Sequence, residues 1–96
     1  MSDLAYRLLT EDELSAGLED LPGWIVEDDL LTKVFGFAQY LEGARFAMRV
    51  AETADKLNHH PDMLIQYDAV VISVNTHDVG GLSPYDLELA RRIEAI

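Results

Sequence analysis

The chain has 96 residues, 49% hydrophobic and 26% charged, which is the composition of one folded domain and excludes a disordered chain. It carries 18 acidic and 7 basic residues, and the resulting net charge of −11 argues against binding to nucleic acid or to anionic membranes. It has no cysteine, so disulfides, thiolate nucleophiles and cysteine-ligated zinc are excluded.

The N-terminal stretch has no basic segment followed by an apolar one, so it does not resemble a signal peptide. No apolar run reaches transmembrane length. The sequence therefore predicts a soluble cytoplasmic protein with a single domain over residues 1–96.

The first clear element is a helix over Glu11–Asp20. Thr10 and Glu13 have the spacing of a capping box, in which each side chain accepts a hydrogen bond from the other residue's backbone amide. Pro22-Gly23 ends this helix.

Two strands and a long helix are expected next. Residues 24–27 and 30–37 are rich in β-branched and aromatic side chains, and Asp28-Asp29 between them is typical of a hairpin turn. A helix is predicted from Ala38 to about Leu57, and its apolar residues cover a wider arc than contact with one sheet requires. The extra apolar surface is expected to meet a partner subunit. The two sides of the arc are Leu41, Ala44, Ala47, Met48 and Ala51, and Phe46, Val50, Ala54 and Leu57.

Asn58 is a suitable residue to end that helix, and Pro61 favours an extended conformation for His60. Strands are predicted over residues 63–67 and 70–77, joined at Asp68-Ala69. In the second strand, the alternation assigns Val70, Ile72, Val74 and Thr76 to the core, and Val71, Ser73, Asn75 and His77 to the opposite face.

A last helix begins at Pro84 and runs close to the C-terminus. Ser83 is placed as its N-cap and Asp86 as the third helical residue, while Leu82 and Leu87 have the spacing of a hydrophobic staple. The predicted order is α-β-β-α-β-β-α, an α+β fold with one four-stranded antiparallel sheet and its helices on one face.

The three histidines, His59, His60 and His77, are brought together by a helix end and a strand end. Imidazoles titrate near neutral pH, so they can transfer protons in an elimination of water. A second interpretation is a metal site that adds Asp62, although adjacent histidines in an extended segment point in different directions. A third is that these side chains carry no chemistry.

The surrounding motif resembles the pterin-4a-carbinolamine dehydratase family, which is also known as the dimerization cofactor of a homeodomain transcription factor. The matching elements are Asp55 followed by His59-His60-Pro61, then Tyr67, His77 and Asp86, together with the run THDVGGLSPYD and the stretch Pro22-Gly23-Trp24. Many family members carry glutamate at the position of Asp55.

This resemblance implies an enzyme that removes water from 4a-hydroxytetrahydrobiopterin to give quinonoid dihydropterin, which regenerates the cofactor of aromatic amino acid hydroxylases. It implies catalysis by His59, His60 and His77, no metal or organic cofactor, and a homodimer or homotetramer. The alternatives are a coactivator module that binds proteins through the helix at residues 38–57, or another pterin role such as molybdopterin metabolism.

Other residues are assigned supporting roles by the same resemblance. Asp55 is expected to orient an imidazole one helical turn further on, and Trp24 either stacks near the pterin or belongs to the core. Asp86 is explained by its capping position and is interpreted as structural. The supporting set is Asp55, Pro61, Trp24, Asp78 and Asp86.

Overall fold

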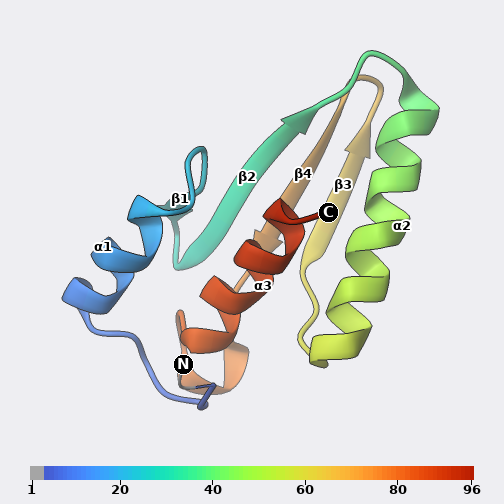
Figure 1. Ribbon diagram of the computed structural model, residues 1–96. Helices are drawn as coiled ribbons and strands as arrows, with labels where there is room; N and C mark the ends of the chain where they lie inside the picture. The colour runs from blue at the N-terminus through green and yellow to red at the C-terminus, as the bar shows by residue number, and fades with distance from the viewer. Residues whose placement is uncertain (1–3) are drawn as a thin grey trace.

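The computed structural model describes residues 4–96, and the first three residues of the predicted domain lie outside this range. Within it the helices and strands follow the predicted order (Figure 1). They are α1 (Glu11–Glu19), β1 (Ile25–Glu27), β2 (Leu30–Gly36), α2 (Tyr40–Leu57), β3 (Asp62–Gln66), β4 (Ala69–Val74) and α3 (Pro84–Glu94), with a short 3₁₀ helix, η1 (His77–Val79), before α3.

The strands form one antiparallel sheet in the order β1-β2-β4-β3, which confirms the predicted fold class. The central pair, β2 and β4, is registered from Leu31 opposite Val74 to Gly36 opposite Ala69. Asp28 and Asp29 make the turn between β1 and β2 with φ angles of 53° and 60°. Aspartate tolerates this left-handed conformation, and a two-residue turn of this kind matches the twist of the flanking strands.

One face of the sheet holds the core and is covered by α2 and α3 (Figure 1). The predicted inward residues of β4 are all buried, and each fully buried valine or isoleucine contributes roughly 1.5–3 kcal/mol to stability. The opposite face is open and exposes Val34 and Leu64. The core side chains that meet across this layer are Val70, Ile72 and Val74 from β4, Val50 and Ala54 from α2, and Leu89, Ala90 and Ile93 from α3.

Two predicted boundaries were wrong near the middle of the chain. Helix α2 begins at Tyr40 and not at Ala38, because Gln39 is extended and its amide donates to the Glu42 carboxylate at 3.1 Å. Strand β3 begins and ends one residue earlier than predicted. Its last residue, Gln66, pairs with Ala69, so the turn falls on residues 67–68.

The last strand was also predicted too long. Strand β4 ends at Val74, and Thr76 instead forms an isolated bridge with Gly81, in which the Thr76 amide donates to the Gly81 carbonyl at 2.8 Å. His77 therefore begins η1 and does not end a strand. Thr76 nevertheless remains on the buried face, as the alternation predicted.

The predicted start of α3 is confirmed in detail. The Ser83 hydroxyl accepts from the amide of Tyr85 at 3.2 Å, and the Asp86 carboxylate accepts from the amide of Ser83 at 2.8 Å. The capping box of α1 is also present, with Thr10 and Glu13 bonding at 3.1 and 2.9 Å. Among residues 4–96, no helix is long and apolar enough to cross a membrane.

Candidate active site

The end of α2 determines where the two adjacent histidines point. Asn58 caps the helix in the left-handed conformation, with φ 55° and ψ 43°. The His59 amide then donates to the Ala54 carbonyl at 3.1 Å, which keeps His59 against the helix end. As a result the His59 side chain is buried, whereas the His60 side chain is exposed.

The His59 side chain is held by a buried carboxylate. Its Nε2 lies 2.6 Å from Oδ1 of Asp86, and Asp86 has no exposure to solvent. Oδ2 of Asp86 accepts from the Thr76 hydroxyl and from the Ser83 amide, each at 2.8 Å. These donors offset the cost of removing a carboxylate from water. Asp86 is therefore both the α3 cap and the partner of His59.

This contact determines how the His59 ring is protonated. An ionised carboxylate only accepts hydrogen bonds, so the proton of neutral His59 is assigned to Nε2. Among the described residues, no buried side-chain nitrogen or oxygen lacks a partner. Within residues 4–96, Nδ1 of His59 has no hydrogen-bond partner, so it is not a fully buried atom. His59 thus presents a proton-accepting nitrogen on the side away from Asp86.

A second carboxylate holds His60. Its Nε2 lies 2.9 Å from Oδ1 of Asp55, and both side chains are well exposed. The spacing of one helical turn had pointed from Asp55 to His59, whereas the imidazole that Asp55 contacts is that of His60. An exposed ion pair of this kind stabilises the fold by about 0–1 kcal/mol, so its significance lies in where it directs the ring.

His77 completes the cluster from η1. Its side chain is fully exposed, and the nearest carboxylate is that of Asp78 at 4.0 Å. All three histidines line one open cavity of about 270 Å³. The described residues that line it are Tyr6, Asn58, His59, His60, Asn75, Thr76, His77 and Asp78.

Of the five predicted supporting residues, only Asp78 lines this cavity; Asp55, which bonds to His60 from outside it, and three others do not. Trp24 is buried in the core, where its Nε1 donates to Glu94 at 3.0 Å, so the core alternative describes it. Pro61 follows the two histidines and is absent from the lining. Asp86 acts from behind His59 and does not reach the cavity.

The geometry gives no support to the metal interpretation. Among residues 4–96, no group of three or more histidine, aspartate or glutamate side chains is gathered closely enough to hold a metal ion. His59 already uses one ring nitrogen on Asp86, and Asp62, which that interpretation required, is not among the lining residues.

The sequence did not predict the contribution of Tyr6. It lies in a segment with no periodic pattern, and a backbone hydrogen bond from Leu9 to Leu82 (2.8 Å) brings this segment to the cavity. Asn75 was predicted to share a face with His77, and it does line the cavity. Asn58 was recognised only as a helix cap.

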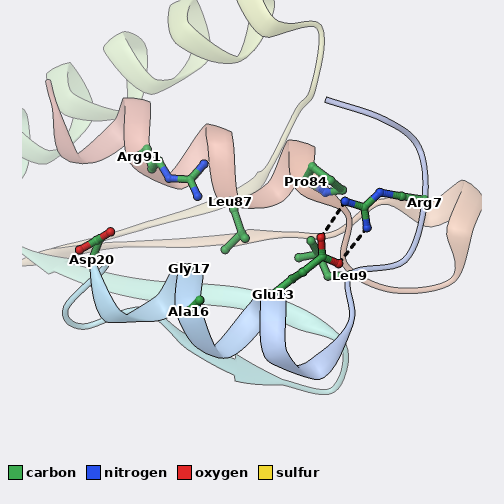
Figure 2. A pocket seen from close by; sticks show the side chains of 9 residues that line it. All are labelled: Arg7, Leu9, Glu13, Ala16, Gly17, Asp20, Pro84, Leu87 and Arg91. Carbon is green, nitrogen blue, oxygen red and sulfur yellow. Dashed lines mark hydrogen bonds and ion pairs between the residues drawn. The ribbon is translucent and has the colours of Figure 1, made fainter. Parts of the chain in front are cut away.

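A larger cavity of about 310 Å³ lies elsewhere, between α1 and α3 (Figure 2). Leu9, Ala16 and Leu87 give it an apolar lining, and the Arg7–Glu13 ion pair lies at one end. It contains no histidine. Volume alone would select this cavity, but the three imidazoles are in the smaller one.

Comparison with known proteins gives one consistent family. Residues 7–96 match the model of the family described as pterin 4 alpha carbinolamine dehydratase. A protein of Prochlorococcus marinus strain MIT 9303 is 43% identical over 93 residues, which cover 97% of each chain. One from Sulfurisphaera tokodaii is 38% identical over 90 residues, covering 94% of this chain and 97% of the relative. Both bear the name "Putative pterin-4-alpha-carbinolamine dehydratase".

Solved structures share the fold. A transcriptional coactivator/pterin dehydratase from Brucella melitensis superposes with a TM-score of 0.84 at 32% identity, covering 91% of this chain and 95% of that one. A pterin dehydratase-like RuBisCO assembly factor of the alpha-carboxysome superposes with a TM-score of 0.61 at 20% identity, covering 75% and 83%. The second similarity concerns the fold alone.

Proposed function

The chain belongs to the pterin 4 alpha carbinolamine dehydratase family, and we propose that it removes water from a 4a-hydroxytetrahydropterin to give quinonoid dihydropterin. In this reaction the C4a–O bond breaks, N5 loses its proton, and a double bond forms between C4a and N5. The hydroxyl leaves as water after it receives a proton. The elimination changes no oxidation state and needs no co-reactant, so it requires only groups that donate and accept protons.

The observation that carries the proposal is the convergence of three imidazoles on one open cavity, two of them bonded to carboxylates. Such groups exchange protons near neutral pH, and positioned general acids and bases typically accelerate proton transfer by about 10²–10⁴-fold.

The roles that we propose follow from the surroundings of each ring. His59 has Nε2 committed to Asp86, so its Nδ1 is the candidate acceptor for the N5 proton. His60 and His77 are exposed to solvent and can be reprotonated from it, so they are the candidates for delivering a proton to the leaving hydroxyl. Asn58 and Asn75 offer amide groups to the polar edge of the pterin.

The experiment is a stopped-flow measurement of 4a-hydroxytetrahydropterin dehydration with purified protein, before and after treatment with a chelator. The proposal predicts a rate above the spontaneous one, proportional to protein concentration and unchanged by the chelator. A rate equal to the spontaneous one would exclude the dehydratase function. Loss of activity with the chelator, restored by added metal, would favour a metal-dependent enzyme instead.

We also propose a pathway, a location and an assembly for the protein. We place the protein in tetrahydrobiopterin recycling in the cytoplasm, with the pterin as its small-molecule partner and with a homodimer or homotetramer as its assembly. The exposed apolar side chains of α2, Leu41 and Met48, provide surface for such an assembly.

A second candidate function is a protein-binding module, which the name of the Brucella structure as a transcriptional coactivator favours. The same exposed side of α2 would serve as the docking surface. The discriminating result is a stoichiometric protein partner that is lost when Met48 is changed while dehydration persists.

A further inference from the structure

Residues 4–10, just before α1, form an arm that is fixed at three points. The Leu9 amide donates to the Leu82 carbonyl at 2.8 Å, at the start of α3. The Arg7 guanidinium donates two hydrogen bonds to the Glu13 carboxylate, at 2.8 and 2.7 Å (Figure 2). Leu8 lies so close to Gly81 that a Cβ on this glycine would be 2.9 Å from its methyl group.

This attachment brings Tyr6 to the wall of the histidine cavity. Its ring stacks on that of Tyr85 with centroids 4.6 Å apart and planes at 20°, and the Tyr85 ring lies 5.5 Å from that of His59. Tyr6 is nevertheless 56% exposed. Because Tyr85 covers one face of the Tyr6 ring, the other face is the one left for a ligand in the cavity to stack on.

We infer that Tyr6 is the aromatic platform on which the pterin ring stacks, a positioning role that rests on the proposed function. C4a is tetrahedral in the substrate, but the N1–C2–N3–C4 part of its pyrimidinone ring is planar and conjugated, and such groups prefer offset stacking on an aromatic face. Among the lining residues that belong to positions 4–96, Tyr6 is the only one with a six-membered aromatic ring. The sequence had suggested Trp24 for this stacking role, but Trp24 is buried in the core. The histidines then act on a ring that Tyr6 holds in place.

The test compares Y6L and Y6F with the wild type in dehydration kinetics and in calorimetric binding of 7,8-dihydrobiopterin, a stable planar pterin. Y40L is the matched control, because Tyr40 is 57% exposed and lies at the start of α2, outside the cavity. We expect Y6L to raise KM and the pterin Kd about 3- to 10-fold, with kcat changed by less than about twofold. Y6F and Y40L should match the wild type. Y6A is a second variant in case Y6L folds poorly.

The outcomes separate this inference from the function on which it rests. If the wild type dehydrates the substrate and a folded Y6L or Y6A has a normal KM and pterin Kd, the platform role is wrong and the function stands. If Y6F is as impaired as Y6L, the hydroxyl and not the ring face makes the contact, which also overturns the inference. If the wild type does not accelerate dehydration, the proposed function fails first.

Discussion

Asp86 has two roles: it caps the start of α3 through the Ser83 amide, and it bonds to His59. Its capping role was predictable because Ser83 is only three residues away, and such spacings reveal helix starts. Its contact with His59 joins residues 27 positions apart and depends on how α3 packs beside the end of α2. The sequence favoured the structural role of Asp86 and placed it among the supporting residues; the capping contact is present, and the contact with His59 was not predicted.

The substitution D86N tests whether this carboxylate sets the state of His59. An amide in its place would also have to donate, although the Ser83 amide and His59 Nε2 already donate there. We expect kcat to fall roughly 10²-fold or more, as when general base catalysis is lost, and stability to fall by about 1–3 kcal/mol. Stopped-flow kinetics and urea unfolding measure the two effects.

Two matched variants make this result specific. D55N removes the exposed partner of His60 and should cost less than about 1 kcal/mol in stability, as is typical for an exposed pair. D68N changes an exposed aspartate in the β3–β4 turn and should leave kcat and the free energy of unfolding as in the wild type. A D86N enzyme with the kcat of D68N would show that His59 does not depend on Asp86.

At the scale of elements, Gly17 sets how closely α1 approaches α3. A Cβ at this position would lie 2.6 Å from Cδ1 of Leu87, a buried core side chain. We expect G17A to lose about 1 kcal/mol net, because overpacking costs about 1–3 kcal/mol while alanine favours a helix over glycine by up to about 1 kcal/mol.

The control for this prediction is G36A, because a Cβ at Gly36 would meet nothing within 4 Å. Without a clash, it should be neutral or slightly stabilising in urea unfolding. Equal stability of G17A and G36A would contradict the close contact between α1 and α3.

The arm that carries Tyr6 depends on an ion pair with a defined pH response. Hydrogen bonds from Arg7, and then from the Thr10 backbone, lower the pKa of Glu13 from 4.5 to about 2. A carboxylate with a lowered pKa stabilises the folded state fully above about pH 4.5, and this contribution is lost as the pH falls toward 2.

E13Q keeps the capping acceptor and removes the charge, so its urea midpoint should lie below that of the wild type near pH 7. The difference between the urea midpoints of E13Q and the wild type should become progressively smaller below pH 4.5. A difference that is constant over this range would mean that the ion pair does not stabilise the arm.

At the scale of the whole molecule, α2 exposes Leu41 and Met48 on the side away from the sheet. We expect the wild type to be a dimer or tetramer by light scattering. M48E should reduce its mass, since burying a charge at an apolar contact is costly. The control is Y67E, at an exposed residue of the β3–β4 turn. A monomeric wild type would contradict this assembly.

How much the sequence could predict also differs with scale. Local patterns were enough for the element order, the caps of α1 and α3 and the buried face of β4, because each depends on residues within a few positions. The resemblance to the family motif assigned His59, His60 and His77 to one site. The place of Tyr6 at the cavity and the contact of Asp86 with His59 could not be predicted, because the first follows from the bond between Leu9 and Leu82 and the second joins distant residues.

The function proposed for the histidine cavity is the dehydration itself. It is tested by the rate of 4a-hydroxytetrahydropterin dehydration in H60A and H77A. Both side chains are exposed, so their removal should leave the fold intact, which circular dichroism checks. We expect each variant to lose about 10²-fold or more of the catalysed rate while still binding 7,8-dihydrobiopterin. Two folded variants that dehydrate the substrate as fast as the wild type would contradict the proposed function.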